Sequence, residues 1–392
     1  MRSFSITDVR AVTPQRVVEN ATVTVEDGTV VSIVEGGAAH TASFDGRGAL
    51  CIPGIVDTHS DGLEMEPRPR PNANLPLDFC VRSFEAKVRA AGVTTLFHGI
   101  GFENDGNRTV EGANRLVDEI ESYRRSGDGH IDHHVLYRLD GRDADGFDAM
   151  VTRFSGTPPE GVPLVSFEDH TPGQGQYRDR TYFEKWLVGS RGLTAEEARR
   201  QVDDIIAERE AVRHNRQRAL PWLTDMAAAG AIRLMAHDPA TEEDVEEALT
   251  WNATIAEFPT TVSAARRARD AGLRIVCGAP NVLRGGSHSG NVSATELISL
   301  GLCDGLSSDY LPFAMLGAVG TLINNGTCSM VDAVRLVTSG PADTVGLDDR
   351  GRLDEGCRAD LVICAIDGSI PDIRAVHRAG NNQVQALAFG SV

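Results

Sequence analysis

Lysine is almost missing from this chain of 392 residues, which contains only Lys87 and Lys185. Arginine therefore supplies nearly all of the positive charge, and acidic residues outnumber basic ones by 56 to 38 for a formal net charge of −18. A surface this acidic argues against nucleic acid and anionic membranes as partners, because both require a basic face. A small anionic substrate would need local clusters of arginine to bind.

Patterned cysteines and long apolar runs are also missing. The seven cysteines are scattered and form no C-x-x-C pair, which favours reduced thiols over a disulfide framework. No stretch of the sequence reaches the roughly 20 apolar residues that cross a bilayer. The N-terminal residues also lack the apolar segment of a secretory signal. We therefore expect a cytoplasmic protein with no membrane partner, and the sequence leaves open whether it forms a homo-oligomer.

Both ends of the chain are predicted to form short β-strands. Residues 4–52 contain three such stretches, and Asp27-Gly28 between two of them indicates a tight hairpin. The segment from Gly351 onward has the same character. Neither piece is large enough to make a stable sheet alone. We therefore predict that they pair in one small β-sandwich domain made of residues 1–52 and 345–392.

Strands and helices alternate in the middle of the chain, residues 53–344. Several helix starts are marked by capping patterns that begin at Thr194, Ser293 and Ser329. The predicted strands are Ile55–Thr58, Thr94–Gly99, His134–Leu139, Leu164–Phe167, Ile232–Met235, Thr254–Glu257, Arg274–Cys277 and Gly305–Ser307. Eight such units in an α/β chain predict a (β/α)₈ TIM-like barrel, with a doubly wound open sheet as the alternative.

Polar residues gather where these strands end. Five of the 11 histidines lie at or just after a predicted strand end: His59, His98, His170, His237 and His288. Carboxylates follow the same pattern at Asp61, Asp140 and Asp309. In a barrel of this kind the chemistry lies at the carboxyl ends of the strands, so we expect these side chains to meet there, with His98 more structural than ligating.

Neutral imidazoles and carboxylates together are the ligands of divalent metals that activate water. We assign His59 and Asp61 to one metal and His170 and His237 to a second. Asp140 is a candidate bridge between the two metals, and Asp309 is a metal-associated general base. The mixed nitrogen and oxygen ligands suit two divalent ions per chain, with Zn, Mn and Fe all compatible.

A second pattern lies in Pro280–Asn291, "PNVLRGGSHSGN". Adjacent glycines allow a backbone to approach a ligand closely and to point N–H groups at an anion, and the planar fork of an arginine suits phosphate. The predicted substrate-binding residues are Asn281, Arg284, Gly285, Gly286, Ser287 and His288. A tight loop at the barrel rim is the alternative interpretation.

Several stretches together resemble the amidohydrolase superfamily, and within it the diphosphatases of the carbon–phosphorus lyase pathway. They are "PGIVDTHSDGLE", "DHTPGQGQ", "AHDPAT", "GAPNVLRGGSHSGN" and "SSDY". The resemblance implies a metal-dependent hydrolase that releases pyrophosphate from a ribose-phosphonate triphosphate by cleaving a phosphoanhydride. It also implies that His-x-Asp replaces the usual His-x-His, so that Asp61 is a ligand in its own right. The residues that match by position are His59, Asp61, His170, His237 and Asp309.

Three departures from this pattern keep other functions open. Asp140 stands where the family carries Glu, Glu168 places an extra anion beside the site, and the sequence differs around Met65. The alternatives are hydrolysis of an amide, cyclic amide or amidine in a small metabolite, and a catalytically silent barrel that serves as a subunit. We expect Glu257 to be a structural carboxylate at the end of its strand.

Overall fold

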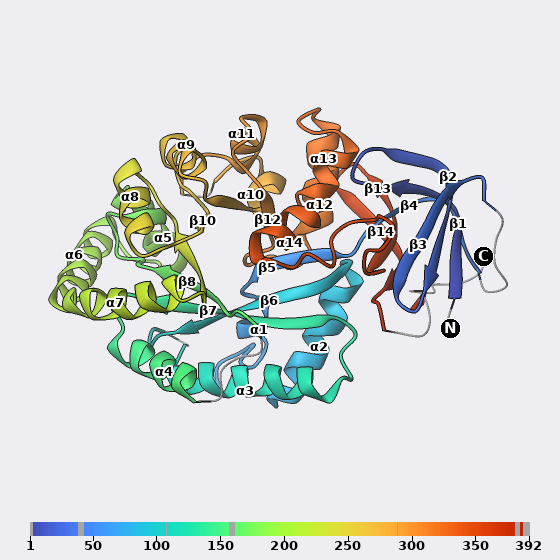
Figure 1. The fold of residues 1–392 in the computed structure, drawn as a ribbon. Coiled ribbons are helices and arrows are strands. Elements are labelled where there is room, and N and C mark those ends of the chain that lie inside the picture. The colour runs from blue at the N-terminus through green and yellow to red at the C-terminus, as the bar shows by residue number, and fades with distance from the viewer. Residues whose placement is uncertain are drawn as a thin grey trace.

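A computed structural model describes residues 3–37, 43–106, 108–156, 161–287, 289–380 and 385–386. Two β-sheets organise this part of the chain, one with eight strands and one with seven. Figure 1 shows the larger sheet at the centre, surrounded by helices, and the smaller sheet beside it at the right. Every helix that the structure describes is too short or too polar to cross a membrane.

The eight-stranded sheet is a nearly closed parallel barrel, as the sequence predicts. Its strands neighbour one another in sequence order, and every predicted strand is present. Beyond the last strand, an isolated parallel bridge between Ser60 and Asp309 brings the first and last strands together. The strands are β5 (Ile55–Ser60), β6 (Val93–Phe102), β7 (Asp132–Asp140), β8 (Leu164–Glu168), β9 (Arg233–His237), β10 (Ile255–Glu257), β11 (Arg274–Gly278) and β12 (Gly305–Ser307).

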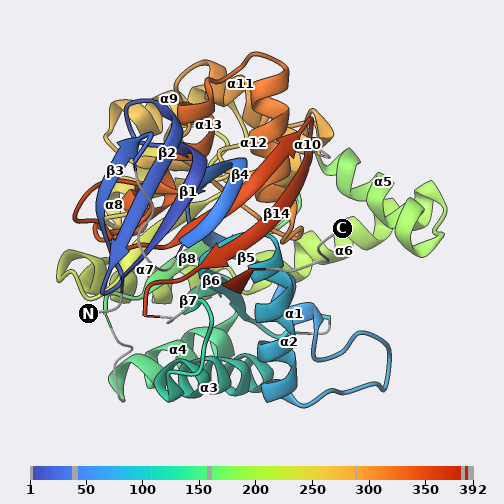
Figure 2. The same cartoon turned by 90° about the vertical axis from the view of Figure 1, so that its right-hand side faces the viewer.

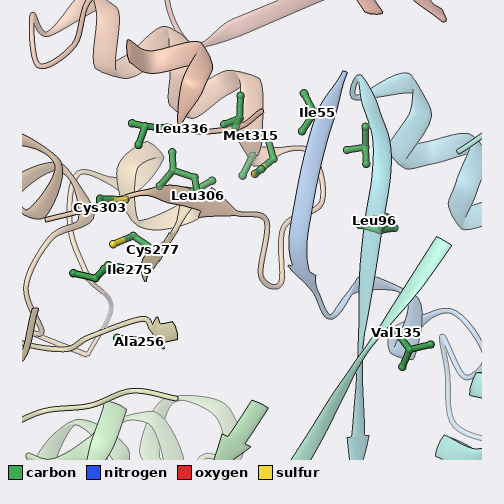
Figure 3. Packing of buried hydrophobic residues seen from close by; sticks show 14 of the residues in the cluster. Ile55, Leu96, Val135, Ala256, Ile275, Cys277, Cys303, Leu306, Met315 and Leu336 are labelled. Carbon is green, nitrogen blue, oxygen red and sulfur yellow. The ribbon is translucent and has the colours of Figure 1, made fainter. Parts of the chain in front are cut away.

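Neighbouring strand residues face opposite sides of the barrel wall. Phe97 belongs to a small apolar cluster with residues of other barrel strands, while the adjacent Leu96 packs in the large cluster beneath the helices. Figure 3 shows part of this large cluster, to which both barrel strands and outer helices contribute. The strands thus bury apolar side chains on both faces, which leaves their ends as the place for polar groups.

Helices follow most of the barrel strands. The main ones are α2 (Leu77–Ala90), α3 (Val110–Ser126), α4 (Ala144–Ser155), α7 (His214–Ala228), α8 (Glu242–Thr250), α9 (Val262–Asp270), α11 (Ala294–Ser299), α12 (Ala314–Asn324), α13 (Met330–Arg335) and α14 (Ser339–Val345). The predicted caps are confirmed, since the side chains of Ser293 and Ser329 each accept a hydrogen bond from the backbone N–H three residues on.

The chain ends form the seven-stranded sheet together. Its strands are β1 (Ser3–Val12), β2 (Val17–Glu26), β3 (Thr29–Glu35), β4 (Ser43–Pro53), β13 (Leu361–Asp367), β14 (Ile370–His377) and β15 (Gln385–Ala386). Antiparallel pairing of β4 with β13 joins the N-terminal strands to the C-terminal ones. The predicted hairpin is confirmed, because Asp27 and Gly28 link β2 to β3 with positive φ angles of 47° and 81°. The exact domain boundaries, 1–52 with 345–392 and 53–344, stay a prediction.

Helices α5 (Arg180–Arg191) and α6 (Ala195–Ala211) lie between β8 and β9 and are called the arm below. They have an apolar core of their own, centred on Leu187, Ala198 and Val202. Thr194 and Glu197 form a complete capping box at the start of α6. Figure 2 shows the pair projecting from the barrel at the right.

The two sheets are linked by an ion cluster around Asp132, the first residue of β7. Arg358 lies 2.6 Å from its carboxylate, the Nε of Arg378 donates to it at 2.8 Å, and Arg350 also contacts it. Burial alone would raise the pKa of Asp132, but these arginines, Arg358 foremost, hold it well below its usual range. The cluster ties the segments that flank β13 and β14 to the barrel.

We expect Asp132→Asn to lower the free energy of unfolding by about 3 kcal/mol at pH 7, because it leaves three arginines without their shared anion. The folded-state pKa lies below the unfolded one, so the stabilisation is full above about pH 4 and is lost as the pH falls. Wild type and variant should therefore converge in thermal unfolding at acidic pH. Asp45→Asn, at an exposed and weakly paired carboxylate, is the control and should have almost no effect.

Candidate functional site

The carboxyl ends of the barrel strands open into one pocket of about 690 Å³. Five of the residues predicted as metal ligands line it: His59, Asp61, His170, His237 and Asp309. His59 lies near the end of β5 and His237 at the end of β9, while Asp61, His170 and Asp309 come just after β5, β8 and β12. The parallel strands all end on this side, which is why residues up to 250 positions apart meet here.

Three groups of side chains in the described residues bring their ligand atoms within 4.8 Å of one another. They are His59 with Asp61 and Asp309; Glu168 with His170 and His237; and His59 with His237 and Glu257. The first two groups share no residue, and Glu257 connects them through its contacts with one histidine of each. Neutral imidazole nitrogens and carboxylate oxygens are suitable ligands for a divalent metal ion.

Glu257, which the sequence suggests as a structural carboxylate, contacts two of the predicted metal ligands. Its two oxygens lie 2.7 Å from Nδ1 of His59 and 2.7 Å from Nδ1 of His237. Ser166 donates a third hydrogen bond, also at 2.7 Å. Burial alone would raise the pKa of Glu257, but the two histidines hold it well below its usual range. A carboxylate that accepts both Nδ1–H groups orients the two rings, so that Nε2 is the nitrogen available to a metal once it has lost any proton.

We expect Glu257→Gln to lower the affinity for divalent metal ions 10- to 100-fold, a typical effect of removing a carboxylate that orients ligating histidines. The amide keeps the shape but can accept only one of the two Nδ1–H groups on its oxygen. Metal content after dialysis and calorimetric titration would measure the change. Glu246→Gln, which alters an exposed carboxylate paired with Arg267, is the matched control. Equal metal content in both variants would contradict this role.

Glu168, and not Asp140, lies in one of these three groups. The two residues are register partners at the ends of β7 and β8, but Asp140 is in none of the three groups. Both of its oxygens accept hydrogen bonds from Arg209 at 2.9 Å. Glu168 is fully buried, and its Oε1 has no hydrogen-bond partner among the described residues. A bound cation would satisfy this buried carboxylate oxygen, which lies beside His170 and His237.

Arg138 is a residue that the sequence did not single out. It points inward from β7, and its guanidinium donates to Asp61 at 2.8 Å and to Glu168 at 3.2 Å. Burial alone would raise the pKa of Glu168, but Arg138 and then His170 lower it to about 2. Gly99 on β6 leaves room for this contact, because a Cβ there would lie 2.7 Å from Oδ1 of Asp61. The extra anion at Glu168 is thus neutralised within the protein.

His170 and His237 differ in protonation. Burial lowers the pKa of His170 to about 4, so its imidazole is neutral at pH 7, the form that binds metals. Burial also acts to lower the pKa of His237, but Asp238 and Glu257 raise it to about 9. A metal ion at His237 would therefore displace a proton.

Three residues just after barrel strands have strained backbone angles. Asp238, Phe258 and Asp309 follow β9, β10 and β12 with φ angles of 52°, 53° and 54°. Non-glycine residues rarely adopt such angles, and they do so mostly at functional sites. Asp309 is held by its backbone, which donates to the carbonyl of His59 at 2.8 Å and accepts from the N–H of Asp61 at 2.9 Å. Burial, and then the charge of Asp61, raises the pKa of Asp309 to about 6.

Only part of the predicted anion loop lines the pocket. Asn281, Arg284 and Ser287 line the pocket, whereas Gly285 and Gly286 are not among its lining residues. The N–H groups of the two glycines bond to carbonyls of α10 (Ala279–Arg284) and end that helix. They act as a helix C-cap instead of a nest for anions. His288 lies outside the described residues.

Arginine reaches the pocket from three elements. Arg284 ends α10, Arg138 comes from β7, and Arg108 lies in the loop after β6. Arg284 is exposed, and its side chain donates to the hydroxyl of Tyr310 at 3.3 Å. The side chain of Arg108 binds Glu64 at 2.9 Å and Glu103 at 2.8 Å. Although the protein is acidic overall, three guanidinium groups thus lie where an anionic ligand would contact the predicted metal ligands.

Comparison with known proteins agrees with this fold. The model of an amidohydrolase family matches residues 295–381. The chain is 34% identical over 365 residues to the alpha-D-ribose 1-methylphosphonate 5-triphosphate diphosphatase of Escherichia coli (strain K12), covering 91% of this chain and 94% of that protein.

Solved structures share the fold at low identity. An N-acetyl-D-glucosamine-6-phosphate deacetylase from Mycobacterium smegmatis superposes with a TM-score of 0.60 at 17% identity, over 96% of this chain and 99% of that one. A triazine hydrolase variant gives a TM-score of 0.63 at 14% identity, over 98% and 94% of the two chains.

Proposed function

The chain belongs to the amidohydrolase superfamily and is a hydrolase, and we propose that it releases pyrophosphate from a ribose-phosphonate 5-triphosphate. The observation that carries this proposal is the pocket itself, which combines metal-binding groups with three arginines. The relative from Escherichia coli, which the chain matches over nearly its whole length, is a diphosphatase for such a triphosphate. Glu168 no longer opposes the proposal, because Arg138 neutralises it.

We further propose two divalent ions per chain, Zn²⁺ first, with Mn²⁺ and Fe²⁺ as alternatives. The two groups that share no residue, at Asp61 and at Glu168, support this number, and their mixed nitrogen and oxygen ligands suit these metals. Glu168, and not Asp140, would supply the carboxylate of the group that contains His170 and His237. Ions bound there would lower the pKa of a water molecule and withdraw charge from the phosphoryl oxygens.

The protein side chains have separate tasks in this reaction. Asp309 accepts the proton of the water that attacks phosphorus and returns it toward the leaving pyrophosphate. Arg284, Asn281 and Ser287 bind phosphate oxygens from the rim, and Arg284 contributes a fixed positive charge. Glu257 keeps the histidines oriented. The described cysteines are all free thiols, which supports a reducing compartment such as the cytoplasm.

Phosphorus NMR tests the proposal directly. The metal-loaded protein is incubated with α-D-ribose 1-methylphosphonate 5-triphosphate, and we expect the triphosphate signals to be replaced by those of pyrophosphate and a 5-phosphate monoester. A fully loaded protein that forms no pyrophosphate would contradict this substrate.

Cleavage of a carbon–nitrogen bond is the alternative, favoured by the fold shared with a deacetylase and a triazine hydrolase. It predicts activity on small amides that is insensitive to competing tripolyphosphate. The silent-barrel alternative rested on Asp140. That support is lost, since Asp140 has a different partner while the remaining ligand set is assembled.

A further inference from the structure

Two arginines hold the carboxylates of Asp140, which ends β7, and Asp169, which comes just after β8. Arg209 donates to both oxygens of Asp140 at 2.9 Å and to Asp169 at 3.0 Å. Arg142 donates to the other oxygen of Asp169 at 2.7 Å. Two carboxylates and two guanidiniums balance in charge, which is the condition for placing them in a largely buried position.

This network holds the two chain neighbours of His170, which are Asp169 and Thr171. The hydroxyl of Thr171 accepts a hydrogen bond from Nε of Arg209 at 2.6 Å and donates one to Asp169 at 2.5 Å. The imidazole of His170 itself has no hydrogen bond among the described residues, and its ring packs edge-on against His237 with centroids 5.2 Å apart. The position of His170 is therefore set by residues 169 and 171, and these are held by arginines.

Arg209 belongs to the arm, in the last turn of α6. The same network docks this helix end, because Arg142 donates to the backbone carbonyl of Arg209 at 3.1 Å and reaches Glu210 at 3.4 Å. The same carbonyl also accepts from the backbone N–H of Val212 at 3.3 Å, so Arg142 adds a second donor at this helix end. The arm and the loop that carries His170 thus share one set of hydrogen bonds.

We propose that Arg209 is a positioning residue that, through Asp140, Asp169 and Thr171, holds His170 where it binds a divalent metal ion together with Glu168 and His237. Docking of the arm then completes this half of the metal site. This inference rests on the metal binding in the proposed function, but not on its substrate. It also assigns Asp140 a role as the anchor of Arg209.

Calorimetric titration with Zn²⁺ tests this role without any substrate. We expect Arg209→Gln to lower the affinity of one of the two ions 10- to 100-fold, the effect of removing a group that orients a ligand, and Arg209→Lys to restore part of it. Arg213→Gln, at an exposed and weakly paired arginine two residues beyond the arm, is the control and should bind as the wild type does. If Arg209→Gln does not fold, the comparison of Arg209→Lys with wild type carries the test.

A double-mutant cycle separates this role from direct ligation by Asp140. If Asp140 acts only through Arg209, then adding Asp140→Asn to Arg209→Gln should cause no further loss of Zn²⁺ affinity. Additive losses would show that Asp140 binds the metal itself, and unchanged binding in the foldable Arg209 variants would show that the network is only structural. Either result overturns the inference. A loaded protein that forms no pyrophosphate would defeat the proposed substrate and leave the inference intact.

Discussion

Asp309→Asn is expected to lower kcat about 10³-fold, within the range that a general base contributes, while KM changes little. Asparagine keeps the size of the side chain and one ligand oxygen but cannot accept the proton of the attacking water. The backbone of Asp309 is fixed by hydrogen bonds to His59 and Asp61, so the substitution should leave the geometry in place. Steady-state kinetics with pyrophosphate detection measure both constants.

The pH profile adds a second signature for the same residue. Burial and the neighbouring charge of Asp61 raise the pKa of Asp309 to about 6, and only the ionised form accepts a proton. The wild-type kcat/KM should therefore fall as the pH decreases through this region, and the residual activity of Asp309→Asn should lack that limb. Asp105→Asn, which removes a carboxylate at the wall of the same pocket, is the control. More than a tenth of wild-type kcat in Asp309→Asn would exclude the role.

The sequence predicts the barrel well because its signals are local. Six of the eight barrel strands end in a polar residue. Each of the helices that follow Thr194, Ser293 and Ser329 begins at a capping side chain. The positions of His59 and Asp61 follow from the same logic. A residue just after a barrel strand needs no tertiary information to be placed at the rim.

The partners of these residues could not be predicted in this way. Glu257 ends a strand of three residues, and its contact with His59 joins positions 198 apart in the chain. The sequence likewise shows two carboxylates at adjacent strand ends, Asp140 and Glu168. It does not show that Arg209, 69 positions from Asp140, binds that carboxylate. Side-chain pairing over such distances depends on how strands and helices pack.

The structure of the anion loop could not be predicted for another reason, because its local sequence is compatible with two conformations. Two glycines after Arg284 suit a nest for phosphate and equally suit the end of a short helix. In the structure the glycines end a short helix, and Gly285 is the C-cap of α10 with a φ of 73°. The helix also accounts for Asn281, whose side chain accepts from the backbone N–H of Ala294 at 2.9 Å. Recognition of phosphate then depends on side chains.

Arg138→Gln is expected to separate catalysis from metal binding. The neutral side chain leaves the buried carboxylates of Asp61 and Glu168 without their shared cation, and the metal-free protein should lose about 3–5 kcal/mol of stability. Divalent ions can replace that missing charge, so metal affinity should be kept or increased. The rise in melting temperature on adding Zn²⁺ should therefore be larger in the variant than in the wild type.

Activity should nevertheless fall in the loaded Arg138→Gln protein, by about 10²-fold in kcat, because a fixed positive charge beside the reacting phosphate is lost. Arg153→Gln is the control: Arg153 is also mostly buried, but it binds Asn114 and Asp118 on the outer helix α3. It should leave kcat and the Zn²⁺-dependent shift unchanged. If Arg138→Gln matched this control in both measurements, Arg138 would have no part in charge balance at the site, and the anionic pair of Asp61 and Glu168 would need another explanation.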